Sequence, residues 1–132
     1  MSRFKNKIVL ITGAGSGIGR STALRLDKEG ATSIVVDMNA EQLKKTHLML
    51  ANPESSSRVL DISSLDDAKK CFEEINDKYG QLDALINVAG ILRFDNSHEV
   101  EISNWNKILE VNLTGTFYMC SFGLPMLLES KG

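Results

Sequence analysis

The first residues of the chain that could do chemistry form a glycine-rich loop, Thr12-Gly13-Ala14-Gly15-Ser16-Gly17-Ile18-Gly19. An apolar stretch precedes this loop and an amphipathic stretch follows it, so the loop is expected to join a strand to a helix. Glycine lets the backbone turn tightly and lets a ligand approach without meeting a Cβ atom. The free amides and the positive end of the helix dipole would then face a diphosphate. A plain strand–helix turn is the simpler alternative.

An acidic residue, Asp37, ends the next apolar stretch of the chain. It follows the last glycine of the loop by 18 residues, close to the spacing at which a carboxylate holds the ribose hydroxyls of a dinucleotide. A carboxylate at this position accepts a hydrogen bond from a free 2′-hydroxyl and repels a 2′-phosphate. The neighbouring residues Ser16 and Met38 carry no positive charge. The predicted cofactor is therefore NAD rather than NADP, although a solvated strand end would also place an Asp here.

Strand-like and helix-like stretches alternate along the chain. The expected strands cover 7–12, 32–37, 58–61 and 83–88. The expected helices cover 17–29, the stretch between Asn39 and Pro53, the stretch between Ser64 and Gly80, and 103–129, with Pro125 expected to kink the last helix or to mark its last turn. This alternation predicts an α/β fold with a parallel sheet and helices on both faces. The chain ends where a fifth strand would begin, so 83–88 is expected to be an uncovered apolar edge.

The composition excludes several other classes of protein. The chain has 132 residues, 42% of them apolar and 24% charged, which favours one globular domain over disorder. Its formal net charge of −2, with scattered Lys and Arg, argues against a nucleic-acid partner. The longest apolar runs, such as 8–11 and 34–36, are too short to cross a bilayer, and no secretory signal is recognisable. We therefore expect a cytoplasmic protein without a membrane partner.

The cysteines and histidines predict neither a disulfide nor a metal site. Cys71 and Cys120 fall in expected helices and are interpreted as reduced packing residues. His47 and His98 are isolated, whereas a zinc site needs paired ligands at short spacing.

Four motifs together resemble those of the short-chain dehydrogenase/reductase family. The loop 12–19 matches the family pattern Thr-Gly-x-x-x-Gly-x-Gly, and the stretches 61–62, 80–90 and 105–115 agree with three further motifs in order and spacing. Val88 departs from the second Asn of the family's Asn-Asn-Ala-Gly, at a position expected to point away from the cofactor. The resemblance extends from Lys5 to Gly132.

The resemblance implies a Rossmann-like fold of three layers with the strand order 3-2-1-4. Residues 1–132 would be the N-terminal, NAD-binding half of such a fold, truncated before the fifth strand. Asp61 and Ile62 would contact the adenine ring, and the fourth strand would line the cofactor cleft. The complete set of expected cofactor-binding residues is Gly13, Ser16, Gly17, Ile18, Gly19, Asp37, Met38, Asp61, Ile62, Asn87, Ala89, Gly90 and Val111.

The family transfers hydride between nicotinamide and an alcohol or ketone. A Tyr acts as acid or base, a Lys four residues later lowers its pKa, a Ser polarises the substrate oxygen, and an Asn holds a water in a proton relay. Only the Asn has a counterpart here, Asn112. Neither Tyr79 nor Tyr118 is followed four residues later by Lys, so this chain alone is expected to be inactive.

Two functions follow from this reading. The first is the cofactor-binding half of an NAD-dependent oxidoreductase that acts on a small alcohol or ketone. The second is a natural short chain that binds a nucleotide or a related subunit without catalysis. In this family the long helix commonly packs against its copy in a second subunit, so the resemblance also implies a homo-oligomer formed through 103–129.

Overall fold

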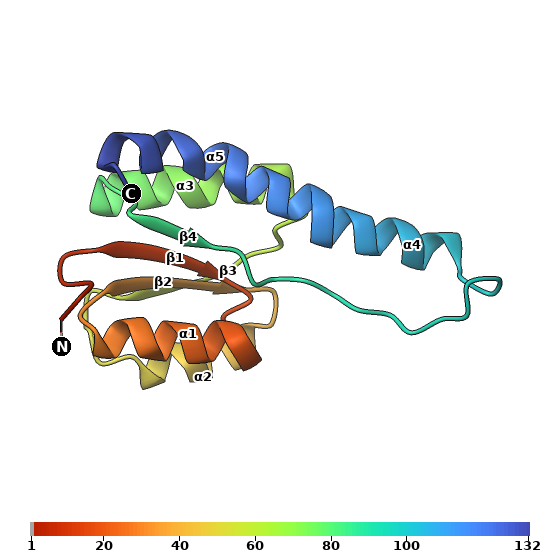
Figure 1. Cartoon of the computed structure of the whole chain (residues 1–132), viewed down its shortest axis with the longest axis horizontal. Helices are drawn as coiled ribbons and strands as arrows, with labels where there is room; N and C mark the ends of the chain where they lie inside the picture. The colour runs from red at the N-terminus through yellow and green to blue at the C-terminus, as the bar shows by residue number, and fades with distance from the viewer. Residues whose placement is uncertain (1) are drawn as a thin grey trace.

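The four predicted strand–helix units are present in the computed structural model, which describes residues 2–132 (Figure 1). Strands β1 (Ile8–Thr12), β2 (Thr32–Asp37), β3 (Ser56–Val59) and β4 (Ala84–Ile86) form one sheet. All its pairings are parallel, and the order is β3-β2-β1-β4. The predicted fold class and strand order are therefore confirmed.

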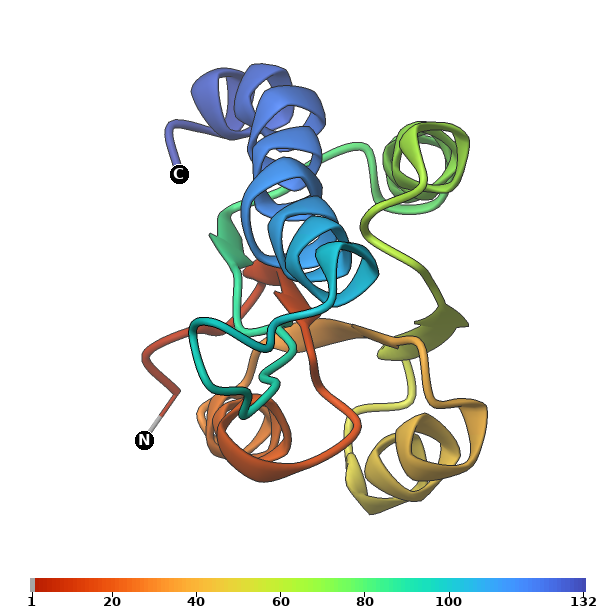
Figure 2. The same ribbon diagram turned by 90° about the vertical axis from the view of Figure 1, so that its right-hand side faces the viewer.

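Helices cover both faces of this sheet. Figure 2 shows α1 (Gly17–Lys28) and α2 (Ala40–Met49) below the sheet, with α3 (Leu65–Tyr79) and α5 (Thr116–Ser130) above it. Alternate residues of a strand point to opposite faces. Val9 and Ile11 accordingly join the core between the sheet and helices α1 and α2. Leu10 joins the core between the sheet and helices α3 and α5.

Local capping signals set three helix ends. Asn39 Oδ1 accepts the amide of Gln42 (3.0 Å) at the start of α2, and Ser64 Oγ accepts the amide of Asp67 (3.2 Å) at the start of α3. Gly80 ends α3 with a φ of 66°, a left-handed conformation that favours glycine.

Strand β3 lies two residues earlier than expected. The sequence predicted 58–61, but the strand spans Ser56–Val59. β3 is an edge strand that pairs only with β2 and buries none of its four residues, so polar side chains are tolerated in it. Ser56 also lies 2.9 Å from the hydroxyl of Tyr79, which gives this serine a polar partner.

Strand β4 is shorter than the predicted 83–88. Its backbone pairs with β1 only over Ala84–Ile86. Beyond that point the amides of Val88 and Ala89 donate to Thr12 Oγ1 (3.1 Å each) instead of continuing the ladder. A buried threonine side chain therefore ends the strand and turns its backbone toward the glycine-rich loop.

The last helical segment is continuous from Ile102 to Ser130. It consists of α4 (Ile102–Leu109), a π-helical turn η1 (Glu110–Gly115) and α5. The break in α-helical bonding falls at η1, whereas Pro125 lies inside α5, which continues for more than a turn beyond it. Pro125 therefore does not mark the last turn.

The first part of this helix extends beyond the rest of the molecule (Figure 1), and α4 buries none of its residues. By length and composition alone, the 29-residue segment Ile102–Ser130 could cross a membrane, which the short apolar runs of the sequence did not indicate. Helices packed in a globular core share this property. Here 22% of the apolar 18-residue window is buried, and the buried residues of α5 are Met119, Gly123 and Met126.

Candidate functional site

A cavity of about 120 Å³ opens where β1, β2 and β4 end. Seven of the residues expected to bind a cofactor line it: Gly13, Asp37, Met38, Ile62, Ala89, Gly90 and Val111. Three further lining residues, Val36, Leu60 and Ile91, were missed by sequence reasoning. Val36 and Leu60 directly precede Asp37 and Asp61, so their place at the strand ends was a usable signal.

Two glycines of the loop allow close backbone packing. A Cβ atom on Gly13 would lie 2.7 Å from the amide nitrogen of Ala89, and one on Gly19 would lie 2.1 Å from the carbonyl oxygen of Gly13. Gly13 also has a φ of 64°, which disfavours any other residue. These two glycines therefore hold the loop against itself and against the chain after β4.

Gly17 has a different environment. Its φ of 52° favours glycine, yet a Cβ atom there would meet nothing within 4 Å. The open space lies beside the first turn of α1, whose leading amides have no partners within the helix. This is the geometry of an anion-binding helix N-terminus.

Both carboxylate oxygens of Asp37 are held by backbone amides. Oδ2 accepts the amide of Gly15 (2.9 Å) and Oδ1 accepts the amide of Asn39 (2.9 Å). Each oxygen keeps further acceptor capacity, because a carboxylate oxygen has two lone pairs. The carboxylate is thus fixed at the cavity wall with acceptor positions to spare.

The carbonyl side of the loop is held from α1 and α2. The hydroxyl of buried Thr46 donates to the carbonyl of Ala14 (2.8 Å). The guanidinium of Arg20 donates to the carbonyl of Gly15, to Thr46 Oγ1 (2.9 Å) and to Gln42 Oε1 (2.9 Å). These contacts hold the carbonyls of Ala14 and Gly15 in place.

Asn112 lies in the π-helical turn and binds the chain after β4. Its Oδ1 accepts the amide of Ile91 (2.7 Å) and its Nδ2 donates to the carbonyl of Ile91 (2.8 Å). The backbone carbonyl of Asn112 accepts the hydroxyl of Thr116 (3.1 Å). The side chain of Asn112 is therefore used to position the backbone at Ile91, beside the cavity.

The remaining predicted residues do not line the cavity. Ser16 and Gly19 belong to the loop but lie outside its wall, as does Gly17. Asp61 Oδ1 accepts the amide (3.0 Å) and the hydroxyl (2.6 Å) of Ser63, which closes a local turn. Asn87 directs its Nδ2 at Cys120 Sγ (3.4 Å).

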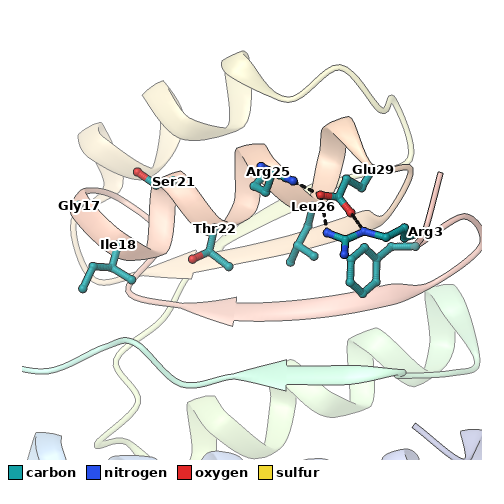
Figure 3. A pocket seen from close by; sticks show the side chains of 9 residues that line it. Arg3, Gly17, Ile18, Ser21, Thr22, Arg25, Leu26 and Glu29 are labelled. Carbon is teal, nitrogen blue, oxygen red and sulfur yellow. Dashed lines mark hydrogen bonds and ion pairs between the residues drawn. The ribbon is translucent and has the colours of Figure 1, made fainter. Parts of the chain in front are cut away.

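Gly17 and Ile18 line a second surface, a groove of about 710 Å³ along α1 (Figure 3). Ile18 is 74% exposed at one end of the groove. At the other end Arg3 and Arg25 both bind Glu29, with an Arg3 Nη2 to Glu29 Oε1 distance of 2.8 Å. Hydrogen bonds from Arg3 and Arg25 lower the pKa of Glu29 to about 2. This ion cluster fixes the N-terminal segment to the end of α1.

Neither a metal site nor a disulfide is found in residues 2–132. No group of three His, Cys, Asp or Glu side chains there is placed to hold a metal ion. Both cysteines are free. Burial raises the pKa of Cys71 to about 11, as expected of a packing residue, whereas Cys120 is exposed.

Comparison with known proteins gives a consistent result. The family model described as short chain dehydrogenase matches residues 7–132. A 3beta-hydroxysteroid dehydrogenase of Mediterraneibacter gnavus is 37% identical over 137 residues, covering 100% of this chain and 49% of that protein. A meso-2,3-butanediol dehydrogenase of Serratia marcescens is 35% identical, covering 98% of this chain and 52% of that protein.

Solved structures show the same relationship. An NAD⁺-bound xylitol dehydrogenase superimposes with a TM-score of 0.92 at 30% identity, over 97% of this chain and 50% of that one. A glucose/ribitol dehydrogenase from Brucella melitensis superimposes with a TM-score of 0.89 at 34% identity, over 94% of this chain and 51% of that one. The chain therefore spans about half the length of the relatives it matches.

Proposed function

The chain belongs to the short-chain dehydrogenase/reductase family, and from this premise we propose that it is the NAD-binding half of an oxidoreductase acting on a small alcohol or ketone. The observation that carries this proposal is the position of Asp37. Its carboxylate lies at the wall of a cavity bounded by the glycine-rich loop, without a basic side chain among the lining residues. Such a carboxylate favours a ribose with a free 2′-hydroxyl.

The residues present fit a dinucleotide. The open space beside Gly17 suits a diphosphate, and the free acceptor positions of Asp37 suit the ribose hydroxyls. Leu60, Ile62 and Val111 give the cavity apolar walls that suit a flat adenine ring. A bound nicotinamide would supply the hydride donor or acceptor. Ser16, Ile18, Asp61 and Asn87 stay proposed cofactor contacts, although they lie outside the cavity wall.

Asn112 is the one proposed catalytic residue in the chain. Both polar atoms of the Asn112 side chain bind the backbone of Ile91, so a water held by Asn112 would bind to the backbone carbonyl of Asn112. That carbonyl accepts the hydroxyl of Thr116, and a carbonyl oxygen has two lone pairs. The Ser and Tyr-x-x-x-Lys residues that the family uses have no counterpart here, so residues 1–132 by themselves are proposed to be inactive.

The proposal is tested by titrating the chain with NADH and with NADPH. Hydrogen bonds to a charged group are worth about 1.5–3 kcal/mol. Asp37→Ala should therefore weaken NADH binding about tenfold to a hundredfold and leave NADPH binding equal or tighter. Asp77→Ala is the matched control, because Asp77 is an exposed carboxylate on α3, away from the cavity. If Asp37→Ala binds NADH as tightly as the unchanged chain, the proposed site is wrong.

The alternative is a subunit-interaction module, favoured by the apolar residues exposed along the long helix. Trp105, Leu113, Phe117 and Leu128 are each more than half exposed. A second subunit that covers these residues would also satisfy the proposed homo-oligomer. Sedimentation of the chain over a range of concentrations tests this surface, and the NADH titration tests the nucleotide site. A chain that associates without binding NADH is a module of this kind, whereas NADH binding supports the cofactor-binding half. A cytoplasmic location stays a prediction from the sequence.

A further inference from the structure

Gly15 occupies a position that the glycine pattern of the family leaves free. Its backbone lies outside the left-handed region, so the conformation itself would accept an alanine. However, the space beside Gly15 is too small for an alanine side chain. A Cβ atom on Gly15 would lie 2.8 Å from Asp37 Oδ2 and 2.9 Å from Asp37 Cγ. The carboxylate of Asp37 therefore occupies the space that a side chain at position 15 would need.

The Asp37 carboxylate depends on this space for its orientation. Because Gly15 has no Cβ, the carboxylate can reach the Gly15 amide at 2.9 Å while its other oxygen accepts the amide of Asn39. Two amides on two different oxygens fix both the position and the rotation of the group. The carboxylate then faces the cavity in one orientation, with its remaining lone pairs available to a ligand.

The loop cannot simply move back to make room for a side chain at position 15. The carbonyl of Gly15 is bound by Arg20, and the carbonyl of Ala14 is bound by buried Thr46. Any clash between an alanine at position 15 and Asp37 is therefore relieved mainly by rotation of the Asp37 side chain. Such a rotation breaks the bonds to both amides.

We propose that Gly15 is a positioning residue for cofactor specificity, because it allows Asp37 to dock on the loop and to present its carboxylate to the ribose. This proposal rests on the proposed NAD-binding function and adds the residue that sets the discrimination. A displaced carboxylate binds a 2′-hydroxyl less well and repels a 2′-phosphate less strongly. Gly15→Ala should therefore change the preference between NADH and NADPH as well as the affinity.

The test compares Gly15→Ala with Gly17→Ala. Both variants add one methyl group to the same loop, but the methyl group at position 17 meets open space and strains only the backbone. We expect Gly15→Ala to lower the ratio of NADH to NADPH affinity about tenfold, the effect of losing one charged hydrogen bond. Gly17→Ala should weaken both dinucleotides by similar factors. A ratio unchanged in Gly15→Ala overturns the proposal.

Amide hydrogen exchange at Asn39 provides a readout that needs no ligand. If Gly15→Ala rotates the Asp37 carboxylate, the Asn39 amide loses its acceptor and exchanges about tenfold faster, while Gly17→Ala leaves it unchanged. The double variant Asp37→Ala/Gly15→Ala has room for the methyl group and should fold even if the single variant does not. Its NADH to NADPH ratio should equal that of Asp37→Ala alone, and any further decrease would contradict the proposal.

Failure of the proposal can be told apart from failure of the proposed function. An unchanged chain that binds neither dinucleotide overturns both. A chain that binds NADH normally, with Asn39 exchange and the cofactor ratio unaffected by Gly15→Ala, overturns only the role of Gly15.

Discussion

The loop region, formed by the glycine-rich loop with β1, β2, α1 and α2, differs from the arm formed by α4 and α5 in whether its side chains have partners within the fold. In the loop region Thr12 and Thr46 are buried and bonded to backbone groups, and Asp37 is held by two amides. In the arm, α4 buries nothing, and its apolar residues face outward. The loop region is preorganised for a small ligand, whereas the exposed face of the arm gains stability only when another surface covers it.

Gly19→Ala should have the largest effect of the substitutions that test this comparison. A Cβ atom there would lie 2.1 Å from the carbonyl oxygen of Gly13, which is backbone and cannot rotate away. We expect a loss of free energy of unfolding of about 4 kcal/mol or more, or a chain that does not fold. Urea denaturation followed by circular dichroism measures it. A loss below about 1 kcal/mol would show that the loop is not closely packed.

This difference also explains which parts of the fold could be predicted from the sequence. Local signals located the helix caps at Asn39, Ser64 and Gly80, because each acts within a few residues of the chain. The bounds of β3 differ from the predicted ones because β3 is an edge strand, and its edge position depends on the order of all four strands. No local pattern reports such a relationship.

The candidate site divides in the same way. The loop and Asp37 were recognisable from residue types and spacing. The hydrogen bonds from Arg20 to Thr46 and from Ile91 to Asn112 join elements whose relative positions are set only by folding. Their residues carried no signal of their contacts, since an Arg in a first helical turn and an Asn within a helix are usually solvated.

Within the arm, the inner and outer faces should respond very differently to truncation. Met119 is fully buried, so Met119→Ala should lower the free energy of unfolding by about 2–4 kcal/mol through lost packing. Leu128→Ala removes a side chain that is 70% exposed and should cost less than about 0.5 kcal/mol. Urea denaturation of both variants checks this. A similar cost for the two would mean that the outer face is covered in solution.

The ion cluster at the end of α1 should give the loop region a stability that depends on acid. Hydrogen bonds from Arg3 and Arg25 hold the folded pKa of Glu29 at about 2, below its ordinary value of 4.5. As the pH falls below 4.5, the unfolded chain takes up the proton first, so the contribution of Glu29 is lost between about pH 4.5 and pH 2. Above pH 4.5 the contribution is fully present.

Glu29→Gln should therefore lower the urea midpoint at neutral pH and flatten its decline in this acid range. Glu41→Gln is the control, because Glu41 pairs with Lys45 on the exposed face of α2. We expect the control to shift the midpoint only slightly at any pH. If Glu29→Gln and the unchanged chain lose stability in parallel on acidification, Glu29 does not keep its ion pairs in solution.

The smallest energetic effect is expected in α4, where the chain carries its one tryptophan, Trp105. Its side chain is 57% exposed, so Trp105→Ala should change the free energy of unfolding by less than about 0.5 kcal/mol. The same exposure makes Trp105 a reporter of whatever covers the arm. In dilute solution its emission should resemble that of free tryptophan and be quenched readily by acrylamide. If emission shifts to the blue and quenching falls as the concentration of the chain rises, a second copy covers α4. Shielded emission at the lowest concentration would contradict an exposed arm, and the contrast with the loop region would then disappear.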